Sequence, residues 1–408
     1  MTSRRQFFAA SASALLVSSV ARANPKFPYP EFEQRIARKD FRGMTKDVLP
    51  TPCMVVDIDL FEKNLKTMAD YAKTAPIYLR PHVKVHKSVD IAKRQVALGA
   101  IGITAATIAE SELMSNGGIK GVLWTKQPAS NNNLLRAIAL TKKDPTFMFV
   151  VDDHAVVARV EEAAAAAKVK ARVAVSVFAG LTRQGIANGR PALELAQKIA
   201  SSKHISFEGY MAYSGFASHT KGWEARRRKT QEDLAGVNET VALSKKAGME
   251  VKIVSGGSTG TYNMDHEFGL TELECGSYVF MDSIYKEVGG KTNDAVYTDF
   301  ESSMSVLTTV DSKHHAGQVT TDYGNKAMAQ LTDKVKGQSW LKVDKQGAEY
   351  GLLRWTDGGG EIKVGDRVEI YCSNLDMSTN CYDRYYIAKG NDIVDVWPIM
   401  GRAGAAQR

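Results

Sequence analysis

Residues 80–87 read RPHVKVHK and follow a short run of strand-forming residues, Ile77-Tyr78-Leu79. Alternation along the predicted strand puts His82, Lys84 and His86 on one face, with two valines on the other. A lysine with cationic neighbours and apolar walls can lose its proton near neutral pH and form a Schiff base with a carbonyl group. A solvent-exposed basic strand end is the other interpretation, so the rest of the chain must decide between the two.

The chain length and the net charge are compatible with several architectures. A chain of 408 residues has room for two domains, or for one large barrel with a smaller partner domain. The formal charge of +8 is mild, and Arg4, Arg5 and Arg22 of the first 23 residues contribute to it. Because the sequence has no Lys- and Arg-rich stretch longer than Arg226–Lys229 and no nucleic-acid-binding motif, we predict no nucleic-acid partner.

The N-terminus has the parts of an export signal. Two arginines and two phenylalanines stand in residues 3–8, an apolar segment follows at 9–20, and Ala21-Arg22-Ala23 is an A-x-A cleavage site. The paired arginines predict a twin-arginine signal peptide at 1–23, cleaved near Ala23, and a periplasmic protein carried by the twin-arginine export machinery. A Sec signal or an amphipathic first helix is the alternative. Residues 9–20 are too few to span a bilayer, so we expect no stable membrane insertion.

The spacing of the four cysteines does not predict a metal site or a redox site. None belongs to a C-x-x-C pair, so neither a zinc cluster nor a redox motif is predicted. A periplasmic protein can hold a disulfide, and Cys372 and Cys381 are the only close pair. Their spacing does not fix the geometry that a disulfide needs.

From residue 77 onward, a short apolar strand, a turn and an amphipathic helix alternate. The predicted strands are 77–84, 101–105, 121–125, 147–152, 171–178, 205–213, 251–255 and 271–275. The predicted helices between them are 88–98, 107–116, 130–142, 155–167, 190–201 and 222–247. Eight such units predict an α/β fold, a (β/α)₈ TIM-type barrel within residues 51–294. An open doubly wound sheet would need a G-x-G-x-x-G turn after its first strand, which is absent.

The segments that flank the barrel have a different pattern. Residues 24–50 are proline-rich and then charged, which predicts an extended N-terminal arm that can join a later sheet. Residues 51–57 read as a strand, and Asp59 is predicted to cap the helix after it. From 295 to 402, short alternating runs between Gly, Asp and Asn turns predict a separate mostly-β domain. Residues 403–408 are expected to form a frayed tail.

Polar and glycine-rich segments follow six of the predicted barrel strands, at the end where barrel enzymes place their catalytic residues. The clearest is SGGSTGT at 255–261. Its three glycines let backbone N–H groups approach an anion, and its hydroxyls add further donors. It lacks the G-K-[ST] sequence of a Walker loop, and a flexible turn is the alternative.

Together, Lys84 after the first strand and an anion-binding loop after the seventh suggest pyridoxal phosphate. The lysine would hold the aldehyde and the loop the phosphate, across the mouth of the barrel. Arg183 could lie beside the ring oxygen of the cofactor, and Tyr213 could contact its ring. A surface arginine and a core tyrosine are the alternatives.

Further motifs stand at ATIAESE (106–112), Gly-x-x-Arg-x-Gly (180–185), Tyr-x-Gly-x-x-x-His (213–219), ELECGSY (272–278) and DYGNKA (322–327). With RPHVKVHK and SGGSTGT they resemble the D-threonine aldolase / D-serine dehydratase-like family, over roughly residues 45–402. The resemblance implies the alanine-racemase fold, a homodimer, and Lys84 as the Schiff-base lysine of pyridoxal phosphate. The cofactor-binding residues that we predict are Lys84, His82, Thr107, Arg183, Tyr213, Ser255, Gly256, Gly257, Ser258, Thr259, Gly260 and Tyr278.

One segment departs from the family pattern. Family members carry a His-x-Asp or His-x-Cys pair for a divalent metal, and the corresponding residues here are Asn374 and Asp376. The resemblance therefore implies a metal site (Mg, Mn or Zn) at Asp376 and Asn374, although an amide oxygen binds Mg²⁺, Mn²⁺ or Ca²⁺ better than zinc. The resemblance implies that this metal polarises the β-hydroxyl of the substrate. Tyr350 and Phe178 are further departures, since the family has a histidine and an aspartate there.

Three functions fit these residues. The first is a pyridoxal phosphate-dependent lyase on 3-hydroxy-D-amino acids, by retro-aldol cleavage or by elimination, in which Lys84 and a nearby histidine, His86 or His219, move protons. The second is a pyridoxal phosphate-dependent amino-acid racemase or epimerase. The third is a non-catalytic periplasmic protein that binds the cofactor or an amino acid.

Overall fold

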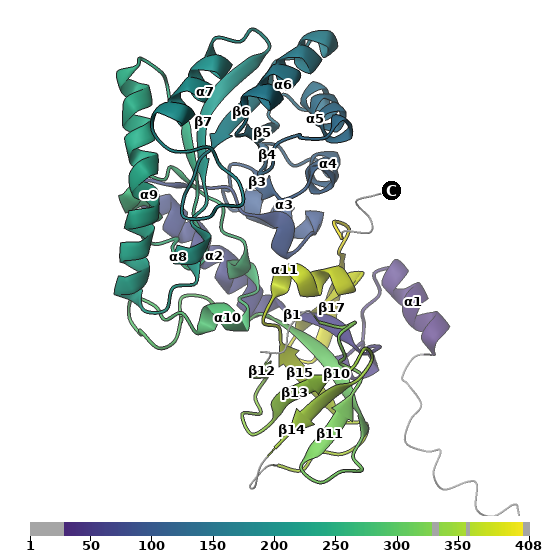
Figure 1. Ribbon diagram of the computed structural model, residues 1–408. Coiled ribbons are helices and arrows are strands. Elements are labelled where there is room, and N and C mark those ends of the chain that lie inside the picture. Colours follow the sequence, from purple (N-terminus) through teal and green to yellow (C-terminus); the bar gives the residue numbers. More distant parts are fainter. Residues whose placement is uncertain (1–27, 329–333, 356–359, 403–408) are drawn as a thin grey trace, which may run out of the picture.

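The computed structural model describes residues 28–328, 334–355 and 360–402 and places them in two parts (Figure 1). Parallel strands with their helices form the upper part, and mostly antiparallel strands form the lower part. The short helix α11 (Leu375–Ser378) lies at the junction. The predicted signal peptide at 1–23 and the tail at 403–408 lie outside the described residues. Among the residues that are described, no helix is long and apolar enough to cross a membrane.

Eight parallel strands make the upper sheet, in the order β2-β9-β8-β7-β6-β5-β4-β3. A parallel bridge between His82 and Thr104 joins the two edge strands and closes the sheet into a barrel. The predicted (β/α)₈ barrel is therefore confirmed. Its strands are β2 (Tyr78–Leu79), β3 (Ile103–Ala105), β4 (Val122–Trp124), β5 (Met148–Val151), β6 (Ala171–Ser176), β7 (Ile205–Ala212), β8 (Ile253–Gly256) and β9 (Glu272–Leu273).

Helices cover the outside of this barrel because each has one apolar face. In α7, for example, Ala192, Leu195, Ala196 and Ile199 are buried at spacings of three and four residues. The long helices are α2 (Ile58–Thr74), α3 (Val89–Ala97), α4 (Ile108–Asn116), α5 (Asn131–Lys143), α6 (His154–Ala167), α7 (Arg190–Ala200) and α9 (Trp223–Lys246). Shorter turns are α8 (Gly215–Ser218), α10 (Ser283–Lys286) and the 3₁₀ helices η3 (Asp265–Phe268) and η4 (Ser277–Val279).

Two local predictions need correction. The strand predicted at 77–84 ends at Leu79, and Val83–Val85 form a 3₁₀ turn, η2. Residues two apart on a three-residue turn point in different directions, so Lys84 and His86 do not share a face. The cap of α2 is Asp57, whose carboxylate accepts from the N–H of Leu60 at 3.1 Å; Asp59 is already inside the helix.

The lower part is a nine-stranded sheet in the order β11-β14-β13-β12-β15-β10-β1-β16-β17. A second pairing, between β11 and β10, closes six of these strands into a small barrel. The predicted mostly-β domain is confirmed. Its strands are β1 (Cys53–Asp57), β10 (Met304–Ser312), β11 (Gln318–Thr321), β12 (Lys334–Val335), β13 (Lys342–Gln346), β14 (Gly351–Arg354), β15 (Arg367–Tyr371), β16 (Arg384–Lys389) and β17 (Asp392–Pro398).

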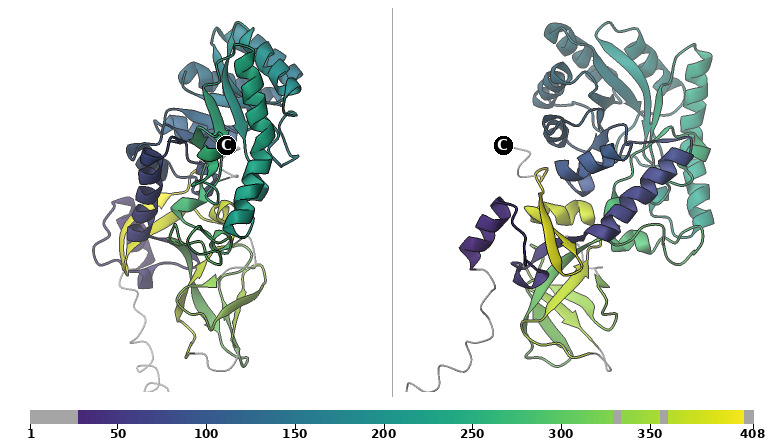
Figure 2. Two further views of the ribbon diagram at one scale, coloured as in Figure 1. Left: turned by 90° about the vertical axis from the view of Figure 1, so that its left-hand side faces the viewer. Right: turned by 180° about the vertical axis from the view of Figure 1, so that it is seen from behind.

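The N-terminal residues also belong to this lower part. β1, which the sequence places in the barrel region 51–294, pairs antiparallel with β10 and parallel with β16. The arm before it is not extended throughout, since it contains the helices α1 (Tyr29–Ala37) and η1 (Lys46–Val48). Phe32 of α1 is buried with Val55 and Tyr386, and α1 stands beside the β domain in every view (Figures 1 and 2).

Buried aromatic side chains hold the two parts together. Phe61 of α2 contacts Trp397 of β17 with ring centroids 5.4 Å apart, and Phe280 contacts Tyr385 at 5.2 Å. The hydroxyl of Tyr385 donates to the backbone oxygen of His86 at 2.8 Å. The β domain is thus fixed directly to the segment that follows β2.

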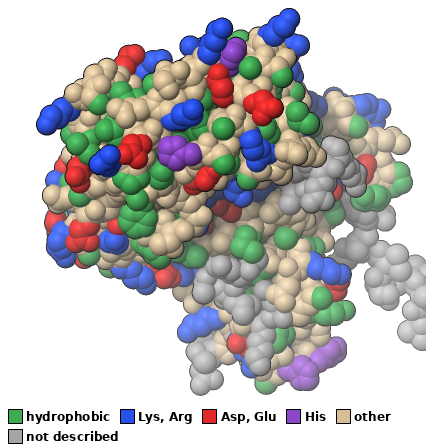
Figure 3. Space-filling view, turned by 45° about the horizontal axis from the view of Figure 1, so that its top comes forward, with side chains coloured by type: hydrophobic (Ala, Val, Ile, Leu, Met, Phe, Trp, Pro, Cys, Tyr) green, Lys and Arg blue, Asp and Glu red, His purple; other side chains and the backbone are tan. Residues whose placement is uncertain are grey.

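On the face shown in Figure 3, positive and negative side chains are interspersed rather than gathered by sign. No disulfide joins Cys372, which is buried, to Cys381, which is exposed.

A buried ion pair links two neighbouring barrel strands. Arg80 donates to both carboxylate oxygens of Glu272, at 2.8 and 3.0 Å, and its other terminal nitrogen donates to the backbone oxygen of Gly121. Both side chains are almost fully buried. Arg80 therefore ties the start of the 80–87 segment to β9.

We expect Arg80→Met to lower the free energy of unfolding by about 3–5 kcal/mol, because it leaves the Glu272 carboxylate buried without its partner. The measurement is urea denaturation followed by circular dichroism. The double variant Arg80→Met/Glu272→Met should recover much of this loss. A single variant as stable as the wild type would contradict the role assigned to the pair.

Candidate active site

A cavity of about 580 Å³ lies at the C-terminal ends of the barrel strands, where the β domain meets the barrel. Its walls come from η2, from the loops after β4, β6, β7, β8 and β9, and from residues 373–376 beside α11. The structure brings together in this cavity ten of the predicted site residues: His82, Lys84, Arg183, Tyr213, His219, Gly257, Ser258, Thr259, Asn374 and Asp376.

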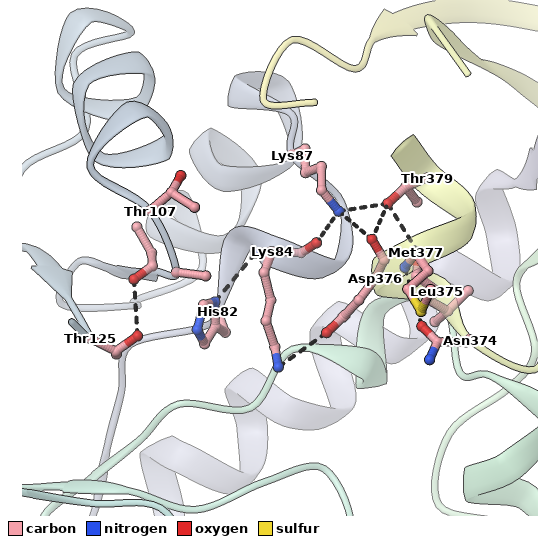
Figure 4. A network of polar contacts seen from close by, with 12 residues as sticks. His82, Lys84, Lys87, Thr107, Thr125, Asn374, Leu375, Asp376, Met377 and Thr379 are labelled. Carbon is pink, nitrogen blue, oxygen red and sulfur yellow. Dashed lines mark hydrogen bonds and ion pairs between the residues drawn. The ribbon is translucent and has the colours of Figure 1, made fainter. Parts of the chain in front are cut away.

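Lys84 extends from η2 toward the β domain. Its Nζ lies 3.1 Å from Oδ2 of Asp376, and the two side chains are about one-third exposed (Figure 4). Burial acts to lower the pKa of Lys84, but the Asp376 and Tyr213 oxygens outweigh it, so the pKa is raised. The expectation that cationic neighbours would make this amine lose its proton is therefore wrong, because a carboxylate from the β domain stands against it.

Three neighbours of Lys84 have defined orientations. Nδ1 of His82 accepts from the backbone N–H of Lys84 at 3.3 Å. Burial, reinforced by the Lys84 cation, lowers the pKa of His82 well below its usual value, so the imidazole is neutral. The guanidinium of Arg183 lies over the ring of Tyr213, 5.3 Å from its centroid.

His219 is the histidine best placed to move a proton. Its Nδ1–H points to the backbone oxygen of Gly215 at 3.4 Å, which leaves Nε2 as the acceptor. Desolvation by the cavity walls lowers the pKa of His219, and the Lys84 cation adds to this effect. The ring also contacts Tyr285, with centroids 4.7 Å apart.

The glycine-rich loop forms one wall of the cavity and rests on Asp265. Gly257 has a φ of +77°, and a Cβ there would lie 2.4 Å from Oδ2 of Asp265. Thr261 donates its hydroxyl to the same carboxyl oxygen at 2.8 Å. The hydroxyl oxygen of Thr259 accepts from the N–H of Tyr278 at 3.0 Å, which ties this loop to the loop after β9.

Six predicted site residues do not line the cavity. His86 is fully buried, its Nδ1 accepts from the N–H of Ser88, and burial lowers its pKa to about 3, so a role in proton transfer is not supported. Thr107 is exposed and caps α4, and Tyr278 is buried against Gln95. The other three contact residues outside the loop: Ser255 donates its hydroxyl to Glu274, and the backbone oxygens of Gly256 and Gly260 accept from Glu274 and Arg226.

Sequence reasoning missed several polar residues of the site. Glu274 and Asp282 line the cavity, and burial raises the pKa of each carboxyl to about 7. Lys126 is an exposed lysine that also lines the cavity. The signals in the sequence were the ELECGSY motif, which contains Glu274, and the position of Lys126 directly after the predicted strand 121–125.

Lys87 is the most informative of the missed residues. Its buried ammonium group donates to the backbone oxygen of Lys84, to the backbone oxygen of Asp376 at 2.7 Å, and to the hydroxyl of Thr379 at 2.8 Å (Figure 4). Burial lowers the pKa of Lys87 to about 8. This one side chain holds the backbone of both residues whose side chains form the Lys84–Asp376 pair.

The residues present fit pyridoxal phosphate. The cavity has the size of a small-molecule site and contains a primary amine, Lys84, for the aldehyde. The hydroxyls of Ser258, Thr259 and Ser277 suit a phosphate group, and Arg183 suits an electron-rich ring.

The residues of this cavity do not fit a divalent metal ion. The side-chain oxygen of Asn374 accepts from the N–H of Met377 at 3.1 Å and caps α11. Asp376 is paired with Lys84. Across the described ranges, no group of three or more His, Cys, Asp or Glu side chains is arranged to hold a metal ion.

A barrel of this kind, with a lysine and a glycine-rich loop facing each other at its mouth, defines the alanine-racemase class of cofactor-binding proteins. Residues 56–284 match the alanine racemase N-terminal domain family, and residues 303–388 match a serine dehydratase domain. The 3-hydroxy-D-aspartate aldolase of Paracoccus denitrificans (strain Pd 1222) is 32% identical over 88% of this chain and 94% of its own length. The D-threonine aldolase of an Arthrobacter species is 29% identical over 86% of this chain and 92% of its own length.

A solved structure of a related enzyme has the same fold. The crystal structure of D-threonine aldolase from Filomicrobium marinum superposes with a TM-score of 0.83 and 30% identity, covering 88% of this chain and 96% of that one. The chain belongs to the D-threonine aldolase / D-serine dehydratase-like family, whose members are pyridoxal phosphate-dependent lyases with the alanine-racemase fold.

Asp265→Asn tests the support of the glycine-rich loop. Burial raises the pKa of Asp265 to about 8 from 3.8, so folding favours the protonated form and this stabilisation is lost as pH rises from about 4 to 8. The variant should differ least from the wild type near pH 4 and become progressively more stable relative to it up to about pH 8. Urea denaturation at several pH values measures this, and a pH-independent difference would contradict it.

Lys87→Met tests the clamp between the two parts. The variant leaves three acceptors, one buried and two partly buried, without their ammonium donor, so we expect the free energy of unfolding to fall by about 2–4 kcal/mol. Lys126→Met removes an exposed lysine from the same cavity and should change stability by no more than about 0.5 kcal/mol. Equal stability of the two variants in urea would show that Lys87 does not hold the parts together.

Proposed function

We propose that this chain is a pyridoxal phosphate-dependent lyase that cleaves 3-hydroxy-D-amino acids. The observation that carries the proposal is the position of Lys84, whose amine lies beside Asp376 in the same cavity as the glycine-rich loop. The aldolases of Paracoccus and Arthrobacter support this substrate class, since they match nearly the whole chain.

Residues from each wall of the cavity would contribute to this reaction. When bound, pyridoxal phosphate withdraws electrons from Cα of the substrate and so makes a bond at Cα easier to break. Lys84 would hold the aldehyde, and Ser258 and Thr259 would bind the phosphate. Neutral His219 can accept a proton at Nε2 or return one. The β domain contributes residues 373–376 to the cavity wall, and this wall would restrict the access of water to the reacting atoms once the cofactor is bound.

We also propose export and assembly, on the sequence features alone. The twin-arginine signal at 1–23 would send the folded, cofactor-loaded protein to the periplasm. Two copies would associate as a homodimer, which the family resemblance supports.

Lys84→Ala should abolish activity and remove the visible absorption band of the purified protein, since no amine remains to hold the aldehyde. The assay supplies D-threonine and 3-hydroxy-D-aspartate and detects glycine with acetaldehyde or glyoxylate. Lys198→Ala, an exposed lysine on α7, is the matched control and should keep both colour and activity.

Two outcomes would decide against the proposal. Formation of only the opposite enantiomer of an added amino acid would indicate a racemase. A colourless wild-type protein that gains no band when pyridoxal phosphate is added would exclude the cofactor itself.

A further inference from the structure

The metal ligands expected from the family are committed to other partners in this chain. The amide oxygen of Asn374 is engaged by the N–H of Met377, and the backbone oxygen of Asn374 accepts from the N–H of Ser378, both at 3.1 Å. This residue is therefore the cap of α11, a role that Asn fills well. A histidine at this position would offer an imidazole nitrogen, which the amide does not replace for most transition metals.

The charges around Asp376 also oppose a divalent cation. Without cofactor the Lys84 ammonium group lies 3.1 Å from its carboxylate, and the Lys87 ammonium group lies 2.7 Å from its backbone oxygen. The Lys87 charge remains when Lys84 holds the cofactor, and it raises the free energy of a cation beside Asp376. Asp376 is the one carboxylate of residues 373–376 that lines the cavity, so a metal would need a second ligand in this segment to overcome that cost.

Asp376 is in the right place to act on the substrate without a metal. The amino group of the substrate must take over the position that Lys84 Nζ holds on the cofactor, and the Asp376 carboxylate is in contact with that position. The β-hydroxyl of a 3-hydroxy-amino acid is two carbon atoms away from its amino group. A carboxylate beside the amino group is thus close to the hydroxyl that must lose its proton.

We propose that this chain cleaves its substrate without a divalent metal, with the Asp376 carboxylate as the base for the β-hydroxyl. The inference rests on the lyase function proposed above. The hydroxyl proton passes to Asp376, its oxygen forms the carbonyl of the aldehyde product, and the Cα–Cβ bond breaks with its electron pair left on Cα. Cα then takes up one proton to give glycine, so that protons balance over the cycle.

The experiment titrates Mn²⁺ into the cofactor-loaded protein by isothermal calorimetry, to about 1 mM. The wild type should show no stoichiometric binding. Asn374→His restores a His-x-Asp pair and should gain one Mn²⁺ site per chain. Asn380→His places the same imidazole in the same segment but outside the cavity lining, and should behave as the wild type. The visible absorption band confirms that each variant is folded and loaded.

A second experiment measures the rate of substrate cleavage. Dialysis against a chelator should leave the wild-type rate unchanged within about twofold, and Asp376→Asn should lower kcat by roughly 10²–10⁴-fold while keeping the absorption band. Added Mn²⁺ should not restore the rate of this variant.

Several results would overturn the inference: one tightly held metal ion per wild-type chain that is lost in Asp376→Asn, activity that a chelator removes and Mn²⁺ restores, or wild-type kcat in Asp376→Asn. Failure of Asn374→His to gain a site would contradict the assignment of the lost metal to that position. If the wild type cleaves no 3-hydroxy-D-amino acid, the proposed function fails instead, and calorimetry still decides whether a metal binds.

Discussion

The contact between Lys84 and Asp376 is the interaction on which the site depends. It joins a lysine at the rim of the barrel to a carboxylate of the β domain, at 3.1 Å. Neither part alone contains the pair, so the chemistry requires that the barrel and the β domain keep a fixed position relative to each other. Lys87 does this at the backbone, because its ammonium group binds the carbonyl oxygens of both residues. Tyr385 adds a bond from the β domain to the backbone of His86, in the same segment.

The elements around this contact explain why the segment 80–87 can be so polar and yet buried. Arg80 is neutralised by Glu272, His82 is neutral and accepts from the backbone, and the Lys87 ammonium group has three oxygen acceptors. Buried charges persist only where such partners exist. Opposite them, Asp265 supports the glycine-rich loop from below, where Gly257 needs a left-handed backbone. Arg80, His82 and Lys87 thus have polar partners, and Lys84 extends into the cavity toward Asp376.

Much of the barrel could be predicted, because each βα unit is encoded by a local apolar run and a local helical pattern. The partners of each strand are a long-range property, which is why β1 was assigned to the barrel although it pairs with β10 and β16. Lys84 and the glycine-rich loop were found from motifs. The strand alternation used to group His86 with Lys84 failed, because residues 83–85 form a 3₁₀ turn. The raised pKa of Lys84 and the role of Lys87 could not be foreseen, since both depend on Asp376, which lies far along the chain in the β domain.

The identity of the lysine that holds the cofactor tests the central claim most directly. Borohydride reduction of the protein purified with pyridoxal phosphate fixes the cofactor to that lysine, and peptide mass spectrometry identifies it. The geometry predicts a pyridoxyl group on Lys84 and none on Lys87, whose ammonium group is buried and fully engaged. A pyridoxyl group on Lys87, or on a lysine outside the cavity, would contradict the assignment of the site.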